Sequence, residues 1–204
     1  MLLKKEGAVI EMSITFAAFV VLCFCADSVR RISLGLFFAA IHECGHLAAM
    51  RIFGAKPNKI TLSAAGVRLC RPPSLRLSYR QEIIIALAGP AASACLGGLF
   101  ALPLLVGASK NAIWLWLIEN GFWINSGFAV FNMLPVEELD GGRTLYFLLC
   151  RVGKESTANM VTFAVSLVIL FFFAAATALQ WMQARFPIGM TIATLYVALC
   201  IGRH

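Results

Sequence analysis

The residues best suited to chemistry lie within an apolar stretch, "AAIHECGHLAAMR", which runs from Ala39 to Arg51. His42 and His46 are four residues apart, so on a helix they share one face, one turn from each other. Two neutral imidazoles in that arrangement can both ligate one zinc ion. Glu43 lies near the same face, where its carboxylate can reach a metal-bound water without ligating the metal. The pattern predicts a catalytic metal site on a helix.

The alternative interpretation is that the two histidines are polar side chains that join helices through hydrogen bonds. Ionisable groups are costly at membrane depth, and they are functional candidates there for that reason. An H-E-x-x-H pattern is uncommon by chance, and less common still inside a membrane-spanning helix. The metal interpretation is therefore favoured.

A catalytic zinc site needs a third protein ligand and leaves its fourth position to water. Apart from the motif, the chain offers one histidine, His204, and two aspartates, Asp27 and Asp140. Asp27 is expected at the outer end of the first membrane span, far from the histidines. Asp140 follows Pro135, which ends a preceding helix because proline has no amide hydrogen. Elimination therefore points to Asp140.

The segment "FNMLPVEELDGGR" offers two rival carboxylates, Glu137 and Glu138, which could instead be solvated at the membrane surface. Gly141 and Gly142 follow Asp140 and are expected to let the chain turn back between helices. Such a turn can carry a carboxylate to the metal. Asp140 is favoured over its two rivals on this ground.

Asn132, near the end of the preceding apolar run, has two interpretations. It could satisfy broken backbone near the proline, or it could donate a hydrogen bond to substrate backbone or to a developing oxyanion. The two are left open. The third apolar run contains the stretch "ALAGPAASACLGG", residues 86–98. Pro90 in this stretch predicts a helix kink, and its small residues predict tight helix packing.

Composition indicates a protein of the lipid bilayer, because 60% of the residues are hydrophobic and only 13% are charged. The predicted fold class is an all-α polytopic membrane protein of about six transmembrane helices. The spans are expected at about 8–26, 32–53, 82–106, 112–134, 158–179 and 186–201. A shorter apolar piece, 144–150, is expected to form a helix that rejoins the fifth span. The sixth is short and could be re-entrant.

Basic residues orient these spans. With a cytoplasmic N-terminus, thirteen of the 17 lysines and arginines fall on the inner side, as the positive-inside rule requires. The net charge of +7 is then a topology signal at an anionic lipid surface, and no nucleic-acid partner is needed. Lys4 and Lys5 before an apolar run also resemble a signal peptide, but Glu11 and the length of the run favour a retained span.

The segment 59–69, "KITLSAAGVRL", carries β-branched residues around a small-residue centre. It predicts a short membrane-associated β-hairpin or strand after the second helix. One interpretation is a connecting loop. The other is an exposed strand edge beside a functional site, able to pair with an extended peptide.

These residues resemble the site-2 protease family of intramembrane zinc metalloproteases, and the match is closest to the bacterial stage IV sporulation protein FB branch. The family's H-E-x-x-H motif appears as His42-Glu43-Cys44-Gly45-His46. Its later motif of Asn, Pro and Asp-Gly appears as Asn132, Pro135 and Asp140-Gly141, and its Ala-Gly-Pro element as Ala88-Gly89-Pro90. The resemblance implies Asp140 as the third zinc ligand and a membrane-embedded strand after the second span.

Two departures from the family are visible. Family members often carry Asn three residues after the Gly-Pro pair, where this chain has Ser93, to which the sequence assigns no role. The sporulation branch typically bears a cystathionine-β-synthase domain, whereas residues 1–204 are expected to form a single transmembrane metalloprotease domain with neither that domain nor a PDZ domain.

The implied activity is regulated intramembrane proteolysis by a zinc metalloendopeptidase with one Zn²⁺. It is expected in the cell membrane, with its active site opening to the cytoplasm. Its expected partners are a membrane-tethered protein substrate and regulatory membrane proteins. The oligomeric state is not indicated. A zinc transporter or sensor is the alternative, but a transporter should place polar groups on both sides of a midplane site, and here they cluster toward one side. An inactive scaffold is disfavoured by the intact Glu43.

Overall fold

The computed structural model describes residues 2–5, 8–63, 66–72, 75–107, 111–183 and 188–201. The chain forms two compact units. The first unit contains Met1–Leu77 and Leu87–Phe131, and the second contains Ser78–Ala86 and Asn132–His204. The division falls inside one long helix, α3 (Tyr79–Leu105), so that its first turns belong to the second unit.

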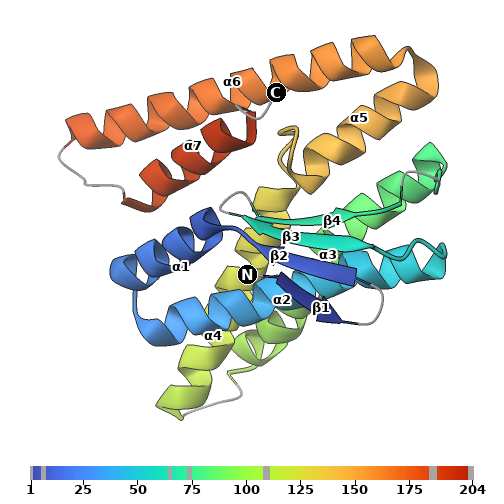
Figure 1. Ribbon diagram of the computed structural model, residues 1–204. Coiled ribbons are helices and arrows are strands. Elements are labelled where there is room, and N and C mark those ends of the chain that lie inside the picture. The colour runs from blue at the N-terminus through green and yellow to red at the C-terminus, as the bar shows by residue number, and fades with distance from the viewer. Residues whose placement is uncertain are drawn as a thin grey trace. The chain divides into compact units, whose positions relative to one another are not determined.

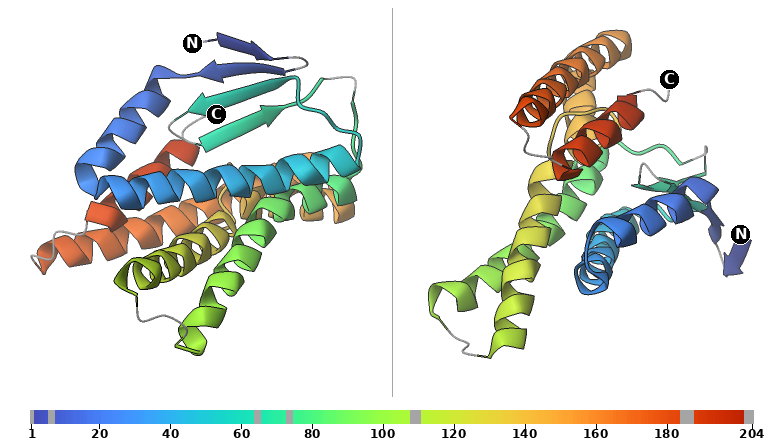
Figure 2. Two further views of the ribbon diagram at one scale, coloured as in Figure 1. Left: turned by 90° about the horizontal axis from the view of Figure 1, so that it is seen from below. Right: turned by 90° about the vertical axis from the view of Figure 1, so that its left-hand side faces the viewer.

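A four-stranded sheet lies in the first unit, beside helix α2 (Figures 1 and 2). Its order is β1-β2-β3-β4, with β1 (Leu2–Lys5), β2 (Ala8–Met12), β3 (Lys59–Ser63) and β4 (Gly66–Cys70). Strands β3 and β4 are antiparallel, with Ile60 opposite Leu69, so the predicted hairpin is present. Strand β2 adds to β3 in parallel, and β1 adds to β2 in antiparallel orientation. The sheet is therefore larger than predicted.

The first predicted span, at about 8–26, was wrong at its start, because residues 8–12 form strand β2 rather than a helix. An apolar run does not by itself distinguish a buried strand from a helix, and here pairing with β3 decides. An ion pair at 2.8 Å between the Lys59 ammonium and the Glu11 carboxylate supports the pairing. Helix α1 (Ile14–Ala26) then begins after Ser13, whose side chain accepts a hydrogen bond from the Thr15 amide.

The helices of the first unit pack through small residues. They are α1, α2 (Val29–Ile52), the later part of α3 and α4 (Ala112–Asn132). A side chain at Gly45 of α2 would come within 2.6 Å of the Ala88 carbonyl of α3. A side chain at Gly121 of α4 would come within 2.9 Å of the Phe100 ring. These glycines allow close approach between neighbouring helices.

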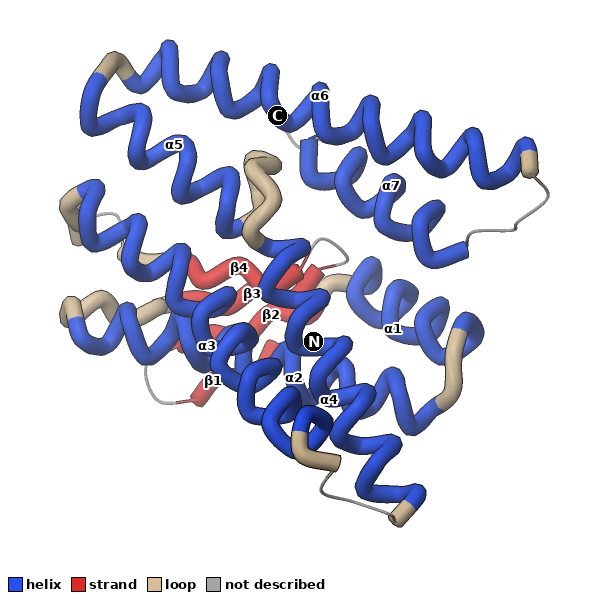
Figure 3. The backbone as a smooth tube through the Cα atoms, turned by 180° about the vertical axis from the view of Figure 1, so that it is seen from behind, coloured by secondary structure: helices blue, strands red, loops and turns tan. Residues whose placement is uncertain are grey.

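The second unit is built mainly from α5 (Asp140–Val152), α6 (Glu155–Met182) and α7 (Ile188–Ile201). The short helix predicted after the fourth span is α5, which ends at Val152, with Gly153 as its C-cap, before α6 begins. Helices α6 and α7 lie side by side (Figure 3). Hydrogen bonds join them, one at 2.8 Å between the Thr177 and Thr194 hydroxyls and one at 3.1 Å from the Trp181 indole to Thr191.

Three of the described helices, α2, α3 and α6, are long and apolar enough to cross a membrane by length and composition. This supports a membrane location. Helices α1, α4 and α7 cover the other three predicted spans with 13, 21 and 14 residues. A helix of 13 residues is about 20 Å long, against about 30 Å of hydrocarbon. The count of six spans therefore stays a prediction.

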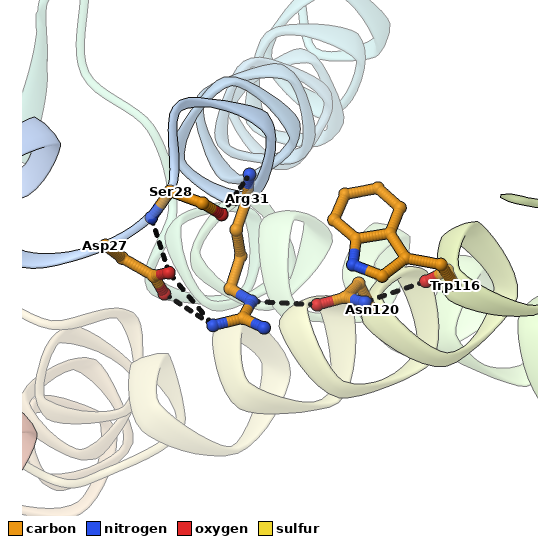
Figure 4. Close-up of polar contacts among 5 residues, drawn as sticks. All are labelled: Asp27, Ser28, Arg31, Trp116 and Asn120. Atoms are coloured by element: carbon orange, nitrogen blue, oxygen red, sulfur yellow. Dashed lines mark hydrogen bonds and ion pairs between the residues drawn. The ribbon is translucent and has the colours of Figure 1, made fainter.

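A polar cluster joins the start of α2 to α4 (Figure 4). The Arg31 guanidinium donates to both Asp27 carboxylate oxygens, at 3.0 and 2.8 Å, and to the Asn120 side-chain oxygen at 3.0 Å. The Asn120 amide in turn donates to the Trp116 carbonyl at 2.7 Å. The Arg31 guanidinium, and after it the Ser28 amide, lower the pKa of the Asp27 carboxyl below its ordinary value.

We expect Asp27→Asn to lower the stability of the folded state by less than about 1 kcal/mol at neutral pH, because the pair is largely exposed. The folded-state pKa is the lower one, so the ionised carboxylate favours the folded state. This stabilisation is complete above the unfolded pKa of about 3.9 and is lost as the pH falls through the folded pKa. Thermal unfolding in detergent at pH 7 and pH 3 checks this. Glu119→Gln, on an exposed side chain of α4, is the control.

Candidate metal centre

The three motif residues lie on α2, a continuous helix that begins after Ser28, whose hydroxyl accepts from the Arg31 amide. His42 and His46 are buried, and Glu43 is half-buried. The helical period brings the two rings together, with their Nε2 atoms 3.2 Å apart. The predicted juxtaposition of the imidazoles on one helix face is thus present.

The separation of the two nitrogens suits a metal ligand pair. Two nitrogens that ligate one tetrahedral zinc ion at about 2.0–2.1 Å lie about 3.3–3.4 Å from each other. The observed 3.2 Å is close to that value. It also suits an N–H···N hydrogen bond when one ring carries its proton on Nε2. In both arrangements the two Nε2 atoms point toward the space between the rings.

Gly89 on α3 borders that space. A Cβ built on Gly89 would overlap His46 Nε2 and would lie 2.6 Å from His42 Nε2. Only glycine leaves this space open, so the residues form a cradle that any side chain would fill. The sequence indicated tight helix packing for Gly89 but not this position against both imidazoles.

Ser93 lies one turn after Gly89 on the same helix. Its side chain is fully buried, and its Oγ lies 3.0 Å from His42 Nδ1. The serine therefore contacts the ring nitrogen that does not face His46. Sequence reasoning gave Ser93 no role, and only the departure from the family's Asn drew attention to the position.

Asp140 is the first residue of α5 in the second unit, and it is buried. A carboxylate in the first turn of a helix is favoured by the helix dipole. The role predicted for the glycines after it was wrong, because Gly141 and Gly142 lie inside the helix rather than in a turn. A Cβ at either position would overlap backbone of the preceding loop, at Met133 or Val136. Their small size therefore holds the loop against the start of α5.

The other candidates of this segment differ in burial. Glu138 is exposed and Glu137 is half-buried, while the Glu137 amide donates at 3.0 Å to the hydroxyl of Ser166, which is buried on α6. Asn132 is half-buried and is the last residue of α4. Among these carboxylates Asp140 is the most shielded, as a metal ligand of a buried site should be.

His42, His46 and Asp140 are all buried, and each offers one atom that could ligate a metal ion. Two imidazoles and one carboxylate are a donor set that zinc accepts. The imidazoles belong to the first unit and Asp140 belongs to the second. That all three residues bind one metal ion is therefore a proposal.

Among solved structures, the fold of this chain is similar to that of the Site-2 Protease from Methanocaldococcus jannaschii. The match has a TM-score of 0.70 and covers 98% of this chain and 93% of that chain, at 19% sequence identity. No family model matches this chain, and no curated protein matches it either. At that identity the likeness shows the fold alone, so the function must be argued from the site.

Proposed function

We propose that this chain is an intramembrane zinc metalloprotease of the site-2 protease type, formed by residues 1–204 as one catalytic domain. It hydrolyses a peptide bond in or near a transmembrane segment of a membrane-tethered protein. The observation that carries the proposal is the buried imidazole pair, 3.2 Å apart on an apolar helix, with Glu43 beside it and Gly89 leaving its open side free. The shared fold supports it.

His42, His46 and Asp140 would hold the ion in this proposal. When bound, zinc supplies a Lewis acid that lowers the pKa of water toward about 7 and polarises the scissile carbonyl. Glu43 accepts the proton of the attacking water on its carboxylate and then passes it to the leaving amine. Asn132 donates a hydrogen bond toward the developing oxyanion or the substrate backbone.

The substrate must be extended before it can be cut, because a transmembrane helix hides its carbonyls in its own hydrogen bonds. In the described part of the chain β4 is an edge strand, paired only with β3. A substrate segment can add to such an edge through backbone hydrogen bonds. We assign the edge of β4, Gly66–Cys70, to substrate pairing.

The enzyme acts in regulated intramembrane proteolysis, in the branch of stage IV sporulation protein FB. It has its N-terminus and active-site opening on the cytoplasmic side, as the basic residues favour. Regulatory membrane proteins would control its access to substrate. The substrate class is a membrane-tethered protein such as a tethered transcription factor.

We expect the purified protein to contain about one zinc ion per chain, because the site offers three ligands and an open position. Elemental analysis by mass spectrometry checks this, with the double variant His42→Ala/His46→Ala as the matched control. Zinc-free wild-type protein would contradict the proposal. A zinc-flux assay in liposomes separates the protease from a transporter, since a protease should show no metal-dependent flux.

A further inference from the structure

Ser93 is a polar side chain in an apolar helix, and its exposed fraction is 0%. A buried hydroxyl without a hydrogen bond destabilises the folded state, so the contacts of Ser93 must offset that cost. The contact that it makes is with a candidate metal ligand, His42, whose Nδ1 lies 3.0 Å from Ser93 Oγ. The hydroxyl therefore contacts one of the two imidazoles of the candidate metal site.

We propose that Ser93 is a positioning residue that fixes the orientation and tautomer of His42 for zinc. The inference rests on the proposed function, since it concerns the ligand pair of that site. The Ser93 oxygen accepts the hydrogen bond from His42 Nδ1–H. An imidazole ligates zinc in its neutral form, which carries one proton, so a proton held on Nδ1 leaves the Nε2 lone pair free for the metal.

The geometry of the ring supports this direction of the hydrogen bond. His42 Nε2 points to His46 Nε2, at 3.2 Å, and to the space that Gly89 leaves open. A proton on that nitrogen would leave it no lone pair with which to ligate a metal ion. Because the two ring nitrogens face opposite partners, the hydrogen bond at Nδ1 decides whether Nε2 is a ligand or a donor.

The expected effect follows from the role of such partners at other metal sites. A hydrogen-bond partner on the remote nitrogen of a ligand histidine fixes the ring, and its loss typically costs about 10–100-fold in metal affinity. Ser93→Ala should therefore weaken zinc binding by about that factor. Ser93→Thr keeps the acceptor oxygen and should retain most of the affinity.

The matched control is Ser126→Ala on α4. Ser126 is a half-buried serine whose hydroxyl lies close to Gly97 of α3. Removal of that hydroxyl deletes a polar group from the same set of helices and leaves the contact between Ser93 and His42 in place. Zinc affinity should be unchanged in this variant.

Two measurements test the inference on purified full-length protein. The first is zinc affinity, by competition with a chelating dye, for wild type, Ser93→Ala, Ser93→Thr and Ser126→Ala. The second is the ¹⁵N resonances of the imidazoles in the metal-free and zinc-loaded protein. The chain has only three histidines, so single His→Gln variants assign them. In wild type, the expected result is that His42 carries its proton on Nδ1. In Ser93→Ala, a fraction of the His42 rings should carry the proton on Nε2 instead.

The outcomes separate the two proposals. Wild type that binds no zinc overturns the protease proposal and this inference with it. Wild type that binds zinc while Ser93→Ala binds equally well overturns the inference alone, as does a proton on Nε2 of His42 in zinc-loaded wild type. If Ser93→Ala does not fold, the affinity of Ser93→Thr and the wild-type tautomer decide the question.

Discussion

Glu43→Gln is expected to reduce peptide hydrolysis by about 10²–10⁴-fold, the typical contribution of a general base, while leaving zinc bound. Glutamine has nearly the shape of glutamate, but its amide cannot accept the proton of the attacking water. Glu43 is not one of the proposed ligands, and the histidines lie on either side of it on the helix. The variant therefore separates proton transfer from metal binding.

The measurement pairs two assays on the same preparations. Elemental analysis gives the zinc content, and cleavage is followed on a panel of single-span membrane proteins tagged at both ends. His46→Ala is the companion variant, because it should lose zinc and activity together. Retained turnover in Glu43→Gln would remove Glu43 from the mechanism. The inactive, metal-loaded variant would also capture uncut substrates for identification by mass spectrometry.

Gly89→Ala is the second change with a large expected effect. The new methyl group would overlap His46 Nε2 and come within 2.6 Å of His42 Nε2, so the rings would have to move apart. The cost in zinc affinity should be at least that of losing an outer hydrogen-bond partner, about 10–100-fold. Proteolysis should fall with zinc occupancy.

Gly98→Ala is the matched control for this prediction. Gly98 lies on the same helix, and a Cβ there would have no neighbour within 4 Å. Alanine is a better helix former than glycine by about 0.8–1.0 kcal/mol, so this variant should be as stable as wild type or more so. Both variants replace glycine by alanine on the same helix, so a difference between them reports the position of the added methyl group. Equal zinc affinity in the two variants would show that Gly89 does not border the ion.

Local patterns carried much of the prediction. The four-residue spacing of His42 and His46 determines that their rings meet on one helix face, because the helical period depends only on the local backbone. The β-branched residues at 59–63 and Gly66 likewise determine the hairpin within one short segment. Apolar composition alone identifies helices that can cross a membrane. Each of these features depends on neighbours in sequence.

What the tertiary structure decided depends on residues far apart in the chain. Residues 8–12 are a strand because β3, about fifty positions later, offers them a partner. Ser93 and Gly89 meet the histidines only because α3 packs against α2. Sequence patterns record the local backbone period and burial, whereas contacts between distant segments depend on how whole helices and strands pack, which no short pattern encodes.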